Sequence, residues 1–258
     1  MILDYKNTSI FYTDSGTGDV IVLLHGFLEN SSIWQPFLSD LQKKNRIICI
    51  DLLGHGQTEC MGYIHPMEQM AEAVNAVLNH LNIKNYTVVG HSMGGYVALA
   101  MAEKYPKTLN GLLLVNSTSQ ADGEERKQNR DRAIAAVKHD HKTFIRIAIA
   151  NLFNPKNRSK YPKVIEQITL EALKTPLQGI VAALEGMKIR TNRTKVLNQF
   201  QYKKAIFISK KDPVLDYNSL VKEAMSTNME IIEFPDGHMS FIENEVVFLQ
   251  NLLHFIEK

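Results

Sequence analysis

Three short runs of the sequence are apolar without interruption, and they constrain the fold more than any other feature. They read VIVLL from Val20, IICI from Ile47 and LLLV from Leu112. A strand that is apolar at every position has both faces buried, which is typical of a parallel sheet covered by helices on both sides. Longer stretches of helical periodicity separate these runs. The alternation predicts an α/β fold with a mostly parallel sheet and right-handed crossovers.

Eight runs in total are expected to be strands. The first two alternate polar and apolar residues, which suits an antiparallel ribbon at the sheet edge. The expected strands are Ile2–Tyr5, Ser9–Thr13, Val20–Leu24, Arg46–Ile50, Tyr86–Val89, Gly111–Val115, Ala205–Ser209 and Glu230–Glu233. The expected helices of this layered core are Ser32–Leu41, Met67–Leu81, Gly94–Tyr105, Leu215–Ser226 and Glu245–Ile256.

Residues 119–200 interrupt the alternation, because they contain helical patterns and no convincing strand. About eighty residues are too many for a simple crossover between two strands. They predict a helical cap inserted over one edge of the sheet. The α/β core then consists of residues 1–118 and 201–258.

Composition narrows the classes of partner. The 29 basic and 27 acidic side chains give a net charge of +2, which provides no reason to propose a nucleic-acid partner. No run approaches the roughly 18 apolar residues of a membrane span, and the first residues, MILDYKNTSIFYTDSG, show no secretory signal. Cys49 and Cys60 make no disulfide framework. We expect a cytoplasmic monomer or homodimer that acts on a small molecule.

The stretch YTVVGHSMGGYVALA, from Tyr86, places Ser92 in a Gly-x-Ser-x-Gly turn between an expected strand and an expected helix. This is the setting of a nucleophile elbow. Gly90 and Gly94 lack a Cβ atom, so the turn can close around a serine in a strained conformation. The helix start also favours developing negative charge. The alternative is a tight turn that happens to contain serine, and a base elsewhere in the chain would argue against it.

A serine hydroxyl is a poor nucleophile until a base takes its proton. Among nine histidines, His238 is the best placed, because FPDGHMSFIE follows the last expected strand. Imidazole titrates near neutrality and can accept and return a proton. His55 and His65 lie in loops and have a smaller claim to line the pocket. Four others lie in amphipathic stretches and are expected to face solvent: His80, His139, His141 and His254.

The base in turn needs a carboxylate that orients it. FISKKDPVLD places Asp212 directly after the penultimate strand, so the triad follows the order Ser92, Asp212, His238, as nucleophile-elbow enzymes do. Asp216 is the rival, but it lies about one turn further and is expected to point away. Asp236 belongs to a Pro-Asp-Gly sequence typical of a turn.

An oxyanion site requires two N–H donors aimed at the carbonyl oxygen. Met93, the residue after the nucleophile, is expected to supply one, and Phe27 in LLHGFLENSSIW the other. His25 is expected to brace this loop by hydrogen bonds rather than to take part in catalysis.

With these motifs the chain resembles the α/β-hydrolase superfamily over nearly its full length. HGF, GHSMGG and DLLGHGQTE carry the resemblance, the last matching the family's Asp-x-x-Gly-x-Gly-x-Ser segment except for Leu53 in place of a frequent proline and Thr58 in place of the usual serine. In size and four-helix cap it is similar to small bacterial carboxylesterases and to relatives that make or break C–C bonds. Serine at the elbow argues against a haloalkane dehalogenase, in which an aspartate attacks.

The resemblance implies hydrolysis of a small or medium carboxylic ester by acyl transfer, with no metal, nucleotide or organic cofactor. The same triad also serves C–C bond hydrolases, lyases of the hydroxynitrile type and thioesterases, and some proteins of this fold only bind a ligand as receptors. The residues leave these alternatives open. Expected pocket walls are Phe27, Leu28, Trp34, Met93, Val214 and Met239, with Leu152, Phe153 and Met187 as a roof.

Overall fold

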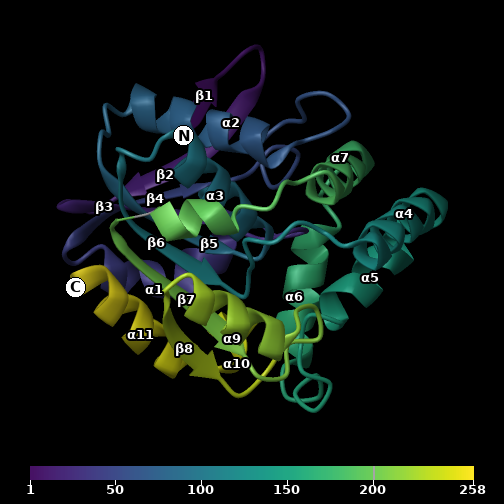
Figure 1. Cartoon of the computed structure of the whole chain (residues 1–258). Coiled ribbons are helices and arrows are strands. Elements are labelled where there is room, and N and C mark those ends of the chain that lie inside the picture. Colours follow the sequence, from purple (N-terminus) through teal and green to yellow (C-terminus); the bar gives the residue numbers. More distant parts are fainter. Residues whose placement is uncertain (200) are drawn as a thin grey trace.

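Residues 1–199 and 201–258 are described by the computed structural model, and within them eight strands form one sheet in the order β1-β2-β4-β3-β5-β6-β7-β8 (Figure 1). From β4 to β8 all neighbouring strands are parallel, whereas β1 and β2 form the antiparallel edge. The predicted mostly parallel eight-stranded sheet is therefore confirmed. The strands are β1 (Ile2–Asp4), β2 (Ser9–Ser15), β3 (Asp19–Leu24), β4 (Asn45–Ile50), β5 (Tyr86–His91), β6 (Leu109–Val115), β7 (Lys203–Ser209) and β8 (Glu230–Phe234).

Two apolar cores cover the two faces of the sheet, which explains the uninterrupted apolar strands. Successive side chains of a strand point to opposite faces. Val22 and Leu24 of β3 accordingly join one core, while Ile21 and Leu23 join the other. Helices α2 (Met67–His80), α3 (Met93–Lys104) and α9 (Tyr217–Ser226) pack in the first core. Helices α1 (Gln35–Leu41), α10 (Ser240–Glu243) and α11 (Glu245–Glu257) pack in the second.

Small differences from the predicted helices have local causes. The segment predicted as one helix over Ser32–Leu41 is divided into a 3-10 helix, η1 (Ser31–Trp34), and α1. The helix predicted from Leu215 begins at Tyr217, because the Asp216 side chain accepts a hydrogen bond from the backbone N–H of Ser219 and caps α9.

The segment between β6 and β7 is helical in its described part, as predicted. It contains α4 (Glu124–His139), α5 (His141–Ala150), α6 (Pro162–Ala172), α7 (Leu177–Lys188) and α8 (Thr194–Gln199). Helix α8 contacts α3 and so lies with the helices of the sheet, whereas α4 to α7 stand beyond the sheet on one side of the molecule (Figure 1). The predicted end of the segment, residue 200, lies outside the described residues.

The register of the parallel strands places their carboxyl ends side by side. Leu24 of β3 is opposite Gly90 of β5, and Val115 of β6 is opposite Phe207 of β7. Residues that follow these strands therefore gather at one edge of the sheet. In the described part of the chain, no helix is both long enough and apolar enough to cross a membrane.

Candidate active site

Ser92 occupies a strained turn between β5 and α3. Its φ of 49° and ψ of −114° are unusual for a residue with a side chain. A Cβ atom on Gly90 would lie 2.4 Å from the carbonyl oxygen of Gly94, and one on Gly94 would lie 2.6 Å from the carbonyl oxygens of Leu24 and His25. Glycine is therefore required on both sides of the serine, because backbone fills the space of a side chain.

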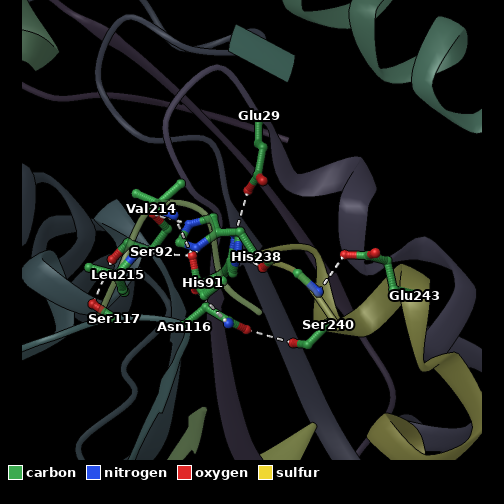
Figure 2. A network of polar contacts seen from close by, with 12 residues as sticks. Glu29, His91, Ser92, Asn116, Ser117, Val214, Leu215, His238, Ser240 and Glu243 are labelled. Atoms are coloured by element: carbon green, nitrogen blue, oxygen red, sulfur yellow. Dashed lines mark hydrogen bonds and ion pairs between the residues drawn. The ribbon is translucent and has the colours of Figure 1, made fainter. Parts of the chain in front are cut away.

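The structure brings Ser92, His238 and Asp212 into one hydrogen-bonded chain. Figure 2 shows Ser92 beside the His238 ring. His238 Nδ1 lies 2.7 Å from Asp212 Oδ2, and His238 Nε2 lies 2.9 Å from Ser92 Oγ. With Nδ1–H donating to the carboxylate, Nε2 is left to accept the serine proton. The three residues come from three different loops, after β5, β7 and β8.

Asp212 is held as a carboxylate. Its Oδ1 accepts hydrogen bonds from the backbone N–H groups of Val214 and Leu215, at 2.8 and 3.0 Å. Burial opposes ionisation, but the His238 ring and the hydrogen bonds outweigh it, so the pKa of Asp212 lies below its ordinary value. The two rival carboxylates bond other groups. Asp216 is exposed at the start of α9, and Asp236 accepts a hydrogen bond from Asn154 Nδ2 at 2.9 Å.

Asn116 orients Asp212, and the sequence reasoning missed it. Its Nδ2 donates to Asp212 Oδ2 at 2.9 Å, and its Oδ1 accepts from Ser240 Oγ at 2.7 Å. Asn116 directly follows β6, the strand between those that carry Ser92 and Asp212. Its position directly after the strand between β5 and β7 is the one sequence feature that could have predicted this contact.

A buried ion pair between Glu29 and His91 lies behind His238. Glu29 Oε2 is 2.9 Å from His91 Nδ1 (Figure 2), and His91 Nε2 donates to the His238 carbonyl at 3.2 Å. Glu29 Oε2 also accepts the backbone N–H of Gly26 at 2.5 Å. Burial lowers the pKa of His91, but the Glu29 carboxylate outweighs this effect and the pKa is raised. The pair joins the loop after β3 to the loop of His238, and no local sequence signal marks it.

The two residues predicted to donate N–H groups to an oxyanion, Phe27 and Met93, lie in the loop after β3 and directly after Ser92. Met93 is the first residue of α3, where N–H groups have no partner within the helix. Within the described residues, the N–H of Phe27 donates to no protein acceptor. His25 braces this loop as expected, since its Nδ1 bonds the Gly26 carbonyl at 2.7 Å and its Nε2 accepts the Leu52 N–H at 2.8 Å.

A cavity of about 90 Å³ opens at Ser92 and His238. It is small beside typical ligand pockets of roughly 300–1,000 Å³. Of the expected walls and roof, the structure brings five residues to this cavity: Phe27, Leu28, Leu152, Val214 and Met187.

Four of the expected pocket residues do not line the cavity, and two of the assigned substrate contacts need correction. Trp34 and Met239 are fully buried in the core on the α1 and α11 face, where the Trp34 ring packs 5.9 Å from that of Phe241. Each flanks a motif in sequence, but its side chain points into the protein. Phe153 lies in the same core, and Met93 lies in the core on the opposite face.

His55 and His65, weighed as candidates for the pocket, are fully buried outside its lining. Their ring atoms His55 Nε2 and His65 Nδ1 have no hydrogen-bond partner within the described residues. Burial lowers the pKa of His55 to about 3 and that of His65 to about 4. Both rings are therefore neutral in the folded protein at pH 7.

Because of these two buried rings, we expect the folded protein to become less stable as the pH falls. Unfolded histidine titrates near pH 6.5, so below that pH the unfolded state binds more protons than the folded state. The free energy of unfolding should fall by up to about 1.4 kcal/mol per pH unit for each ring, down to about pH 4 for His65. Urea titrations between pH 7.5 and 5 measure this slope. His65→Gln should reduce it and His254→Gln, at an exposed position, should not; equal slopes in all three proteins would contradict the prediction.

Within the described residues, no group of three or more His, Cys, Asp or Glu side chains is arranged to hold a metal ion.

Comparison with known proteins assigns the family. A family model described as the alpha/beta hydrolase fold matches residues 19–245. The chain belongs to this family. The resemblance stated from the sequence motifs is thereby confirmed, and an α/β hydrolase is what the elbow and the sheet had predicted.

Several relatives of this α/β hydrolase are known. It is 22% identical over 251 residues to 3-oxoadipate enol-lactonase 2 of Acinetobacter baylyi, covering 95% of this chain and 92% of that protein. A solved esterase from Thermogutta terrifontis, with malate bound, is 29% identical with a TM-score of 0.91, covering 97% of this chain and 93% of its own. The enol-lactonase of Burkholderia xenovorans shares the fold at 19% identity and a TM-score of 0.92, over 100% of both chains.

A relative with a higher sequence identity matches a shorter part of this chain. An uncharacterized protein of Mycobacterium tuberculosis is 35% identical over 103 residues, which is 40% of this chain and 30% of that protein. The match thus spans less than a third of the length of that relative.

Proposed function

We propose that this protein is a serine hydrolase that cleaves a small carboxylic ester by acyl transfer. Ser92 is the nucleophile, His238 the general base and Asp212 the carboxylate that orients it. The observation that carries the proposal is the continuous chain of hydrogen bonds from Ser92 Oγ through the His238 ring to Asp212, at 2.9 and 2.7 Å. This is the geometry that an activated serine requires.

In the first half of the reaction, Ser92 Oγ forms a bond to the ester carbonyl carbon while its proton passes to His238 Nε2. The carbonyl π electrons move to the oxygen, which the N–H groups of Phe27 and Met93 stabilise. The tetrahedral intermediate then collapses, the bond to the alcohol oxygen breaks, and His238 protonates the departing alcohol. The acyl group remains on Ser92.

In the second half, water attacks the acyl carbon and gives a proton to His238. Collapse of this second intermediate breaks the bond to Ser92 Oγ, which recovers the proton from His238, and the carboxylic acid leaves. Asp212 stays ionised throughout. It stabilises the imidazolium and holds the ring in the tautomer that presents Nε2 to the serine.

Helices α4 to α7 act as the cap in this proposal. The cap contributes Leu152 and Met187 to the cavity. The cap also holds the loop of the base in place, because the backbone N–H of His238 donates to the Leu152 carbonyl at 2.9 Å. Glu243 strengthens this junction by accepting the N–H groups of Asn154 and Gly237, at 3.1 and 2.9 Å. The cap and the loop that carries His238 are therefore joined by several hydrogen bonds.

A substrate panel tests the reaction class. We expect nitrophenyl esters of short acids to be hydrolysed faster than acyl thioesters or vinylogous diketones of matched size, with the activity absent in Ser92→Ala. Faster thioester cleavage or C–C cleavage would replace the ester proposal by one of those reactions. A folded protein that turns over none of the three classes would overturn the enzyme proposal in favour of a ligand receptor.

A further inference from the structure

Two arginines of the cap line the same cavity as Ser92 and His238. Arg126 and Arg130 lie four residues apart on α4, so both side chains leave the helix on one face. Arg126 also reaches the loop of the triad acid, since its Nη1 donates to the Val214 carbonyl at 2.9 Å. Positive charge is thus placed in the wall of a small cavity that contains the nucleophile.

These two belong to an arginine cluster, formed by Asp122, Arg126, Arg130 and Arg190. The Asp122 carboxylate is fully buried and accepts hydrogen bonds from Arg126 Nε at 3.1 Å and Arg130 Nε at 2.5 Å. It also forms an ion pair with Arg190 Nη1 at 2.7 Å. Within the described residues, no other carboxylate lies within 4 Å of the three guanidinium groups. Three positive charges against one negative charge leave the cluster at +2.

The other acid in the cavity wall does not balance this excess. Glu29 lines the cavity, but its charge is paired with His91 at 2.9 Å, whose pKa is raised by that carboxylate against the opposing effect of burial. The excess positive charge at the cavity therefore remains without a counterion from the described protein.

The arginines also differ in how many of their donors are used. Arg190 is buried and has protein partners on all sides. It forms an ion pair with Asp122, donates to the carbonyls of Gln120 and Met187, and stacks 4.1 Å over the Tyr96 ring. Arg130 donates only through Nε, so in the described structure both of its terminal nitrogens have no protein acceptor. Its side chain is only 14% exposed.

Arg126 adds a further unused donor. It bonds through Nε and Nη1, so within the described residues its Nη2 has no protein acceptor. Arg126 and Arg130 therefore present three terminal nitrogens that have no protein partner, in a cavity wall where a guanidinium is partly removed from water. These nitrogens keep contact with solvent, since the Arg126 side chain is 38% exposed and that of Arg130 is 14% exposed. A planar carboxylate is the group whose geometry they match.

We propose that the substrate is an ester that carries a carboxylate of its own, bound by Arg126 and Arg130. The cavity of about 90 Å³ is small, which favours a short molecule, such as the half-ester of a dicarboxylic acid of four or five carbons. This inference rests on the proposed hydrolase function, because it names the substrate of the same site. Arg190 and Asp122 hold the two arginines in place and do not contact the substrate.

The test compares esters that differ only in charge. Monomethyl succinate carries the carboxylate in the acyl part, and its neutral partner is the corresponding amide, methyl succinamate. O-butyryl glycolate carries it in the alcohol part, with O-butyryl glycolamide as partner. Acid release in a pH-stat gives kcat/KM for each. We expect the carboxylate member of at least one pair to be preferred by about 10- to 100-fold, as for a charge-assisted hydrogen bond.

Variants locate the source of the preference. Arg130→Gln should bring the preference close to one, and Arg130→Lys should restore part of it because it keeps the charge. The matched control is Arg132→Gln on the same helix, where Arg132 is exposed and bonds Asn129; it should keep the full preference. Added salt should reduce the preference of the parent protein, since screening weakens the attraction.

The outcomes separate the two proposals. If the parent protein hydrolyses nitrophenyl butyrate but treats both charged and neutral partners alike, the inference about the substrate is overturned and the hydrolase function stands. Equal losses on both members of a pair in a folded Arg130→Gln would also overturn it, since they would indicate a purely structural arginine. If no ester is hydrolysed, the proposed function itself fails.

Discussion

Replacing Ser92 with alanine is expected to abolish ester hydrolysis, with kcat falling by about 10⁶-fold. The variant removes the protein atom that forms a bond to the acyl carbon in the proposed mechanism, while the elbow and the N–H groups of Phe27 and Met93 remain. Residual turnover above that of water alone would come from those donors and from substrate binding. Alanine fits the turn, because Ser92 makes its backbone hydrogen bond to the Val115 carbonyl at 2.9 Å without using its side chain.

A fluorophosphonate probe measures the same prediction by a route that does not depend on knowing the substrate. The parent protein should be labelled at Ser92, as located by mass spectrometry, and Ser92→Ala should not be labelled. Ser226→Ala, at an exposed serine on α9, should retain both labelling and turnover. Labelling that persists in folded Ser92→Ala, or a folded parent protein that resists the probe, would contradict the assignment.

Asp212→Asn is expected to lower kcat by about 10⁴-fold and to change KM much less. An amide can donate to the imidazole ring and favours the tautomer with the proton on Nε2, which then cannot accept the serine proton. The loss of the negative charge also removes the stabilisation of the imidazolium. Because Asp212 contacts His238 and not the substrate, the effect should appear in the chemical step.

The matched control for this variant is Asp216→Asn, four residues away. Asp216 is exposed and accepts the Ser219 N–H at 2.7 Å as the cap of α9, a role that asparagine also performs. Its kcat should stay near that of the parent protein. A comparable loss in both variants, or a loss confined to Asp216→Asn, would show that the carboxylate of the triad is wrongly assigned.

Much of the fold could be predicted because the pattern that indicates it is local. The apolar runs at Val20, Ile47 and Leu112 form strands that helices cover on both faces, as an uninterrupted apolar pattern predicts. The elbow around Ser92 was recognisable because backbone fills the space beside Gly90 and Gly94, so few other residue types fit. These features depend on neighbours within a few positions of the chain.

His238 and Asp212 lie far from Ser92 in sequence, but their place after a strand was itself informative. Strands of a parallel sheet end at a common edge, so the residues directly after them are brought close together whatever their separation along the chain. Asn116 is placed in the same way, because it directly follows β6, and its side chain bonds Asp212. Its role could not be predicted from the chemistry, because acyl transfer requires a nucleophile, a base and a carboxylate but no amide side chain.

The sequence therefore determined the sheet, the elbow and the loops that carry Ser92, Asp212 and His238, whereas tertiary packing decided the direction of each side chain. Trp34 and Met239 stand near the motifs in sequence, but their side chains pack in the core on the α1 and α11 face of the sheet. The pair of Glu29 and His91 and the excess charge of the arginine cluster depend on distances between separate loops and helices. Such distances follow from how the layers pack, and no local pattern of residues carries them.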